Sequence, residues 1–381
     1  MRWPARDQGS VSTLPAECLD YDGFNACAAM RSVRALPRPM NALQLVAPQR
    51  LEMGELPDPP DPGPMEVLVR LRASGVCGSD MHTFSEGGIA GTDANYPCVL
   101  GHEPSGEVAA VGPGVTDLSP GAMVAVEPFI VRAECEFTRT GRQNLALSHQ
   151  FLGRDLPGAL REYAVMPRRN LMPMPDGMTF ADAAFVEPLA VLLHSFELAE
   201  LRMGETVAVL GTGPIGLIAV ALAKVAGASV IVAADRIEHR LQRALKLGAD
   251  VAVNVDQDSV VDAVMDLTGC GAHVVIDGAG KSESINNALA CLRPGGRMVL
   301  VGIPAEPAIP LNLWTALDRE ARIHVQKRSN GNDHDALDLL KRGLIRSEDI
   351  ISHRFPLERG QEAFETMAEY REGVLKPLIE W

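Results

Sequence analysis

The chain has 381 residues, enough for two domains with separate cores, and its 46% hydrophobic and 22% charged residues are ordinary for a soluble α/β protein. Its 35 basic and 49 acidic residues give a net charge of −14, which argues against a nucleic-acid partner because phosphates would be repelled. No apolar run reaches the roughly 18 residues of a membrane span, so no membrane partner is expected.

Residues 1–39 differ in pattern from the rest of the chain. They show neither strand alternation nor a helical period, and charged residues interrupt any signal-peptide core. We expect a disordered extension or a start codon assigned too early; the alternative is a short interface arm. The seven cysteines are odd in number and never form a C-x-x-C pair, which favours a reducing compartment, the cytoplasm.

From Met40 onward, short strand candidates separated by glycine and proline turns predict a mostly-β, barrel-like unit. These candidates are residues 41–46, 67–71, 106–112 and 122–126. The pattern then changes to strands that alternate with helices, which predicts a doubly wound parallel sheet. Its predicted strands are residues 206–210, 230–234, 251–253, 274–276 and 298–301, and its predicted helices are residues 216–226 and 237–247. After about residue 325 the pattern is less regular, with helices near 336–341 and 360–370.

A glycine-rich turn lies between a predicted strand and a predicted helix, with the sequence Gly211-Thr212-Gly213-Pro214-Ile215-Gly216. Such a turn lets a backbone approach a pyrophosphate at a helix N-terminus. Asp235 follows Gly216 by about 20 residues, where a carboxylate accepts hydrogen bonds from the ribose of NAD. Arg236 and Arg240 are the nearby residues that would suit the 2′-phosphate of NADP, and we predict NAD. The predicted coenzyme-binding residues are Gly211, Gly213, Pro214, Ile215, Gly216, Asp235, Arg240 and Val301.

Thiolate and imidazole donors that could hold zinc precede this turn. Cys77 and His102 are the predicted ligands, and Glu103 and Glu187 are candidates for the third ligand or for one that acts through water. Cys98 is a competing thiol without the glycine-rich setting.

Three residues of the Cys77 motif could support such a site. Asp80 could accept the other ring N–H of His102 and so set its tautomer. Ser79 and His82 could relay a proton from a bound alcohol to water.

Together these motifs resemble the medium-chain zinc-dependent alcohol and polyol dehydrogenases, most closely the sorbitol dehydrogenase branch. The resemblance runs from Met40 to Trp381 and is carried by Gly75–His82, Gly101–Gly106, Val111-Gly112, Val186–Ala190, Gly211–Gly216 and Leu292–Arg297. It implies a GroES-like catalytic domain over 40–188, a Rossmann domain over 189–325, a return to the catalytic domain over 326–381, and a homo-oligomer, either dimer or tetramer.

The resemblance also implies residue roles. Cys77 and His102 would bind zinc, and Glu187 stands where better-known zinc alcohol dehydrogenases use a second cysteine. Glu103 would enter or leave the coordination sphere, and Ser79 would take the alcohol proton. Arg328 falls near a family arginine that helps to hold the polyol or the coenzyme.

The chain departs from many of these relatives at the structural zinc. The four ligand positions hold Arg132, Cys135, Thr138 and Ala146, and a single thiol cannot make a four-ligand site. We predict one zinc ion per chain. The departure also argues against a threonine dehydrogenase, because those enzymes typically keep the four cysteines.

We therefore hypothesise an enzyme that uses zinc and NAD to oxidise a polyol or secondary alcohol to a ketone. The alternatives are a threonine-type or other zinc alcohol dehydrogenase, a zinc-free quinone or enone reductase, and a non-catalytic dinucleotide-sensing or structural protein. Metal content would separate the zinc-free enzyme from the others, and turnover would separate the non-catalytic protein.

Overall fold

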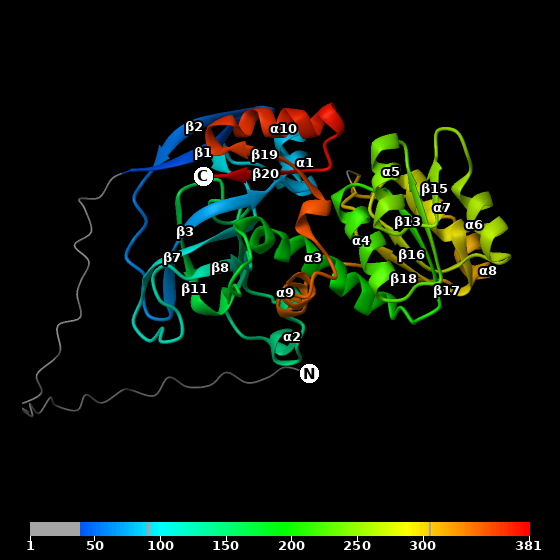
Figure 1. Ribbon diagram of the computed structural model, residues 1–381, viewed down its shortest axis with the longest axis horizontal. Helices are drawn as coiled ribbons and strands as arrows, with labels where there is room; N and C mark the ends of the chain where they lie inside the picture. The colour runs from blue at the N-terminus through cyan, green and yellow to red at the C-terminus, as the bar shows by residue number, and fades with distance from the viewer. Residues whose placement is uncertain (1–38, 90–91, 305) are drawn as a thin grey trace, which may run out of the picture. The chain divides into compact units, whose positions relative to one another are not determined.

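The computed structural model of the protein describes residues 39–89, 92–304 and 306–381 (Figure 1). The expectation for residues 1–39 therefore lies outside the described residues, apart from Pro39. Within the described part of the chain, no helix is long and apolar enough to cross a membrane.

The first half of the described chain forms mainly short strands, as predicted. Seven strands share one sheet: β3 Glu66–Gly75, β7 Glu103–Val111, β8 Met123–Val126, β11 Tyr163–Pro167, β12 Leu171–Pro173, β19 Ile351–Pro356 and β20 Lys376–Glu380. Its order is β12-β8-β7-β3-β20-β19, and β11 also pairs with β3. Smaller sheets contain β1 Met40–Ala47, β2 Arg50–Leu56 and β6 Cys98–Val99; β4 Gly88–Ile89 and β5 Thr92–Asp93; and β9 Phe129–Val131 and β10 His149–Phe151.

Strand β20 comes from the far end of the chain and pairs antiparallel with β3, as the red and blue ribbons in Figure 1 show. The sequence did not predict β19 or β20. Lys376 and Pro377 open β20, and neither residue type is common in a strand that is paired on both sides. The less regular pattern expected after residue 325 therefore concealed two strands.

The second large sheet is parallel, as predicted. Its strands are β13 Thr206–Leu210, β14 Val230–Asp235, β15 Val251–Asn254, β16 Ala272–Asp277, β17 Leu292–Leu300 and β18 Arg322–Val325. The helices around it are α4 Pro214–Val225, α5 Glu238–Leu247, α6 Val260–Thr268, α7 Ser282–Cys291 and α8 Leu313–Asp318. The order β15-β14-β13-β16-β17-β18 is that of the dinucleotide-binding Rossmann fold.

Alternate residues of β13 enter two separate cores, as the period of a strand requires. Val207 and Val209 pack in a cluster with residues of α4, whereas Ala208 and Leu210 pack in a cluster with residues of α6 and α7. Helices therefore cover both faces of the parallel sheet, and the buried strands are apolar throughout.

The remaining helices are α1 Gly78–Glu86, α2 Glu136–Arg139, α3 Phe180–Ala199, α9 Asp333–Lys341 and α10 Gly360–Ala368. Helix α3 begins with a capping box, in which Thr179 and Asp182 exchange hydrogen bonds. It packs against both β7 and α4. It also spans residues 188 and 189, where the sequence division places a domain boundary. One continuous helix thus links the two sheets.

Candidate active site

The predicted metal ligands come together through one strand pairing. β3 and β7 run antiparallel with Gly75 opposite Glu103. Cys77 follows β3 as the N-cap of α1, and His102 immediately precedes β7. The ligand atoms of Cys77, His102 and Glu103 all lie within 4.8 Å of one another. Two motifs that are distant in sequence therefore form one cluster.

Asp80 lies against His102, in the place that the sequence suggested. Its Oδ1 is 3.3 Å from His102 Nδ1 and accepts the backbone N–H of Gly101 at 3.1 Å. Burial alone would raise the pKa of Asp80, but the charge of His102 and the hydrogen bonds hold it below its usual value. An ionised Asp80 would keep His102 Nε2 free to act as a ligand.

Glu103 has a partner that sequence reasoning missed. Lys376 in β20 is only 2% exposed, and its Nζ lies 2.5 Å from Glu103 Oε2 and donates to Val76 O. A Cβ at Gly75 would collide with this pair, so a larger residue there would displace the Glu103 carboxylate. The available signal was a single lysine within the apolar segment 374–379.

Ser79 and His82 both line the same cavity but have different neighbours. Ser79 Oγ is 3.2 Å from His102 Nε2, so it lies at the ligand cluster. His82 Nδ1 is 3.1 Å from Glu86 Oε1, one turn further along α1. Among the described residues, no hydrogen bond joins Ser79 to His82, so the proton relay stays a prediction.

Glu187 and Cys98 line the cavity but lie outside the ligand cluster. Glu187 is buried in α3, where burial and then the charge of Glu103 raise its pKa to about 7. Its carboxylate could act through water or move to bind directly. The structure brings together one carboxylate, that of Glu103, with the thiol and the imidazole.

The cavity has a volume of about 1220 Å³, and residues from both the mixed-sheet part and the parallel-sheet part of the chain line it. Cys77, His102 and Glu103 line its metal-binding side. From the parallel sheet, the residues that follow three strands also line it: Gly278 and Ala279 after β16, Val301–Ile303 after β17 and Gln326–Arg328 after β18. Ligands of open parallel sheets bind at these carboxyl ends.

The glycine turn has the geometry of a phosphate-binding loop. Gly211 has a φ of 86°, and a Cβ there would lie 2.8 Å from Ala279. A Cβ at Gly216 would collide with Gly211 O, so Gly216 permits close packing of α4. Gly213 is the N-cap of α4, followed by Pro214 and Ile215. A Cβ at Gly213 would meet only Arg240 Nη1, at 3.7 Å, which leaves space for a ligand.

Asp235 ends β14 and is held beside this turn. Its Oδ2 accepts the backbone N–H of Thr212 at 2.7 Å, and its Oδ1 accepts those of Arg236 and Ile237. The Arg236 side chain forms an ion pair with Asp256 at 3.0 Å. Arg240 is buried, with its guanidinium 4.8 Å from the ring of Tyr370. The predicted acidic residue and Arg240 are thus both at the turn.

Known proteins share these two units and their order. Residues 63–176 match the alcohol dehydrogenase GroES-like domain, and residues 214–342 match the zinc-binding dehydrogenase domain. A sorbitol dehydrogenase from Bacillus subtilis is 33% identical over 346 residues, which cover 90% of this chain and 98% of that one.

The chain belongs to the zinc-binding alcohol dehydrogenase family.

Two further members of the family show its range. An L-threonine 3-dehydrogenase from Saccharopolyspora erythraea is 35% identical over 350 residues, covering 90% of this chain and 99% of that one. The structure of an alcohol dehydrogenase from Thermus sp. ATN1 is 33% identical, with a TM-score of 0.84 over 90% of this chain and all of that one. The predicted fold class, a GroES-like unit with a Rossmann unit, is confirmed.

The residues of this dehydrogenase suit the two cofactors of its family. A thiol, an imidazole and a carboxylate within 4.8 Å are a donor set that zinc prefers. The open space at Gly213 and the start of α4 suit the pyrophosphate of a nicotinamide dinucleotide.

Residues 132–146 contain the four positions that hold a structural zinc ion in many relatives, and here hydrogen bonds hold this segment in place. Thr138 Oγ1 accepts the N–H of Cys135 at 2.9 Å and donates to its carbonyl at 3.0 Å. Asn144 Nδ2 donates to Lys327 O at 2.8 Å, and Asn330 Nδ2 donates to Gly141 O at 3.0 Å. We call residues 132–146 the lobe; it is joined directly to the segment after β18.

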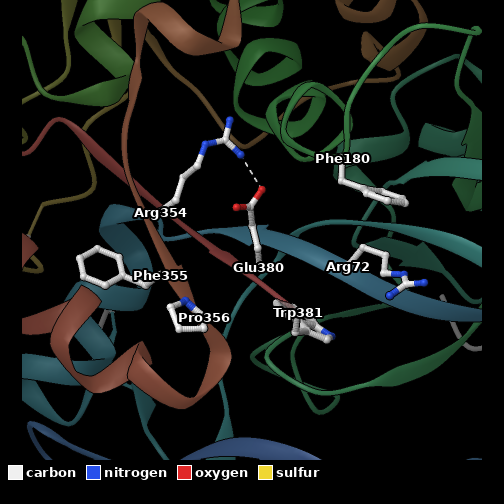
Figure 2. A pocket seen from close by; sticks show the side chains of 7 residues that line it. All are labelled: Arg72, Phe180, Arg354, Phe355, Pro356, Glu380 and Trp381. Carbon is white, nitrogen blue, oxygen red and sulfur yellow. Dashed lines mark hydrogen bonds and ion pairs between the residues drawn. The ribbon is translucent and has the colours of Figure 1, made fainter.

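A second cavity, of about 480 Å³, is lined by Arg72, Phe180, Arg354, Phe355, Pro356, Glu380 and Trp381 (Figure 2). It contains none of the predicted site residues. Its two cations are paired, since Arg354 points at Glu380 with 2.5 Å between them and Arg72 pairs with Glu107 at 3.0 Å. The larger cavity is therefore the candidate active site of the dehydrogenase.

Proposed function

We propose that the protein uses zinc and NAD to oxidise a polyol or secondary alcohol to a ketone. One observation carries the proposal: Cys77, His102 and Glu103 line the same cavity as Gly278 and Val301 at the ends of the parallel strands. An alcohol at the cluster would therefore lie beside a nicotinamide at the strand ends. The sorbitol dehydrogenase relatives support a polyol as substrate.

Zinc, when bound, supplies a Lewis acid that lowers the pKa of an alcohol. Cys77 and His102 would hold it, with Glu103 or Glu187 as the third ligand. Asp80 would orient His102 through the 3.3 Å contact with its Nδ1.

Ser79 Oγ, at the cluster, would accept the alcohol proton, and His82 would pass it to water. The carbinol carbon would then lose a hydride to the nicotinamide, leaving a ketone and NADH.

For the coenzyme we propose NAD rather than NADP. The Asp235 carboxylate stands at the turn, where it would bind ribose hydroxyls and repel a 2′-phosphate. Arg236 is engaged by Asp256, which leaves Arg240 as the nearby cation, and its Nη1 faces Gly213 and the pyrophosphate position. Gly211, Pro214, Ile215, Gly216 and Val301 would complete the coenzyme site.

We also propose the domain division and metal content that the sequence suggests. The pairing of β20 with β3 supports a return of residues 326–381 to the catalytic domain, although α3 is continuous across residue 188. The hydrogen bonds of Thr138 support a lobe that needs no metal, and hence one zinc ion per chain. Cys77, Cys98, Cys135, Cys270 and Cys291 are free thiols, which supports a cytoplasmic location.

A homo-oligomer is the proposed assembly, either dimer or tetramer. β18 ends the parallel sheet as an edge strand, and its Val325 is 78% exposed. In α8, Leu313, Trp314 and Leu317 are each at least 70% exposed. A second copy would cover these apolar side chains. Trp314→Glu should then convert the assembly to monomers in light scattering, whereas a wild-type monomer would contradict the proposal.

The deciding experiment measures NADH and NADPH formation across polyols, secondary alcohols and L-threonine, with matched samples treated with a chelator. We expect activity on polyols with NAD that is lost on chelation and restored by zinc. Activity that survives complete metal removal would overturn the zinc role. Threonine as the preferred substrate would favour the threonine-type alternative.

A further inference from the structure

Two neighbouring cations, Lys327 and Arg328, line the active-site cavity just after β18. Arg328 has a φ of 56°, a left-handed conformation that is uncommon for a non-glycine residue. Lys327 is exposed and Arg328 is half-buried. We call these two residues the cation pair.

The cation pair lies close to the metal cluster. The guanidinium carbon of Arg328 is 3.2 Å from the ring centre of Phe151, and the ring centre of His102 is 5.1 Å from that same ring. One aromatic ring therefore separates the cation from a metal ligand. A chain-like substrate with one hydroxyl at the cluster could reach the cation pair with another part of its length.

Neither cation has an ion-pair partner among the described residues. Nη1 of Arg328 is also buried without a hydrogen-bond partner there. Glu187 and Glu127 attract Arg328 electrostatically without forming an ion pair. The arginines of the second cavity differ, because Arg354 is paired with Glu380 (Figure 2) and Arg72 is paired with Glu107.

Three of the carboxylates that line the active-site cavity contact other groups. Asp80 contacts His102, Glu103 contacts Lys376, and Asp155 binds Arg154 through both oxygens. Glu55, Asp93 and Glu187 also line the cavity, and none of them forms an ion pair with Lys327 or Arg328 in the described part of the chain. Lys327 and Arg328 therefore have no ion-paired carboxylate among the described residues, although Glu187, Glu127 and Asp155 attract Arg328 electrostatically.

The three cations in this region also repel one another. Burial, followed by the charges of Arg328 and Arg154, lowers the pKa of Lys327. Burial and then Arg154 lower the pKa of Arg328 to about 10. A bound anion would relieve this repulsion.

The backbone of the cation pair is held firmly in place. Asn144 in the lobe donates to the carbonyl of Lys327 at 2.8 Å. Gln326 Nε2 donates to the carbonyls of Arg328 at 3.0 Å and Val191 at 2.6 Å. Both cations are therefore presented to the cavity on a fixed backbone, as preorganised binding requires.

We infer that the substrate is an anionic polyol, whose carboxylate or phosphate is bound by Lys327 and Arg328 while its hydroxyl is oxidised at the metal cluster. This inference rests on the proposed function and narrows its substrate class. The reaction removes a hydride from the carbinol carbon to NAD and a proton from the hydroxyl. The anionic group is unchanged and serves for binding, so a sugar acid or a sugar-alcohol phosphate is preferred over a neutral sugar alcohol.

The test uses the full-length, zinc-loaded protein with saturating NAD. kcat/KM is measured for a hexitol, the matching hexonate and the matching hexitol phosphate. At least one anionic compound should exceed the hexitol by about 10-fold or more, since hydrogen bonds to charged groups discriminate at this level. The hexonate and phosphate arms show which anion the site takes.

Variants then assign the preference to the cation pair. Lys327→Gln and Arg328→Gln should each reduce the anionic-to-neutral ratio of kcat/KM by about 10- to 100-fold. Lys327→Arg should keep most of the preference for the anionic substrate, because the positive charge remains. Lys341→Gln in α9 removes an exposed charge away from the cavity and serves as the matched control. Because Lys327 is exposed, its variants should fold even if Arg328→Gln does not.

The outcomes separate the two proposals. A preference for the neutral hexitol over both anions overturns the anionic substrate and leaves the proposed function standing. Loss of NAD affinity in Lys327→Gln, with an unchanged substrate ratio, also overturns it, because the cation pair would then serve the coenzyme. No oxidation of any alcohol overturns the proposed function and this inference with it.

Discussion

The metal cluster and the lobe illustrate two ways in which this fold holds a polar loop. At the cluster, the pairing of β3 with β7 brings Cys77, His102 and Glu103 together as a set of donors for a cation. In the lobe, Thr138 binds both backbone groups of Cys135, and Asn144 reaches the carbonyl of Lys327. The cluster brings metal-ligand atoms together, whereas polar groups of the lobe are paired by hydrogen bonds.

A buried glutamate also has different charged neighbours in the two regions. Glu103 at the cluster faces a buried cation, Lys376, at 2.5 Å. Glu127, at the start of the segment that leads into the lobe, lies beside a second acid, Asp333. Burial and then Asp333 raise the pKa of Glu127 well above its usual value. Glu103 is therefore paired with a cation, whereas Glu127 lies beside a second acid and holds its proton more tightly than usual.

Under the proposal of one zinc ion per chain, the two regions differ most in their need for metal. Cys77→Ser should remove the bound zinc and lower kcat/KM by about 10³-fold or more, because the Lewis acid contributes several kcal/mol. The matched variant in the lobe, Cys135→Ser, should keep full metal content and activity. Atomic absorption and steady-state kinetics on both proteins check this. Loss of zinc from Cys135→Ser would show that the lobe binds metal.

Breaking the ion pair between Glu103 and Lys376 at the cluster should have the next largest effect, on stability. Lys376→Met leaves Glu103 buried without its cation and should lower the free energy of unfolding by about 3–5 kcal/mol in the metal-free protein. Urea denaturation measures this. Glu103→Gln combined with Lys376→Met should recover part of the loss, because the unpaired charge is gone. Equal stability of the wild type and Lys376→Met would contradict the role of the pair.

The raised pKa of Glu127 near the lobe predicts a pH dependence of stability. Glu127 keeps its proton in the folded protein at pH values where it is ionised after unfolding. The folded state then binds more protons, so stability falls as the pH rises from about 4.5 through the raised pKa, by up to about 1.4 kcal/mol per pH unit. Glu127→Gln should flatten this slope in urea unfolding at several pH values. An unchanged slope would place the proton elsewhere.

Within the lobe, the smallest expected change comes from Thr138. Thr138→Val removes the hydroxyl that binds Cys135 and should cost about 1 kcal/mol of unfolding free energy, with metal content unchanged. Thr140 is exposed, and its hydroxyl donates only to nearby carbonyls. Thr140→Val should therefore lower the free energy of unfolding by less. Thermal unfolding of the two variants makes the comparison. A larger loss from Thr140→Val would contradict the role given to Thr138.

The sequence by itself determined the features that depend on neighbouring residues. The glycine turn before α4 and the alternation of strands and helices follow from local spacing, and the structure confirms both. The Cys77 and His102 motifs could be paired from their donor types and their order before the glycine turn, and the family resemblance supports that pairing. Asp80 could be placed near His102 on the same basis, because it lies one turn of helix from Cys77.

Tertiary structure alone decided which distant charges meet. Lys376 reaches Glu103 because β20 pairs with β3, and its Nζ also donates to Val76, 300 residues earlier in the chain. Glu127 meets Asp333, and Lys327 is held by Asn144, only because the chain returns from the parallel sheet past the lobe. Such contacts leave no periodic signal in the sequence. The free energy of a buried charge depends on partners within a few ångströms, and folding of the chain, not sequence spacing, brings those partners together.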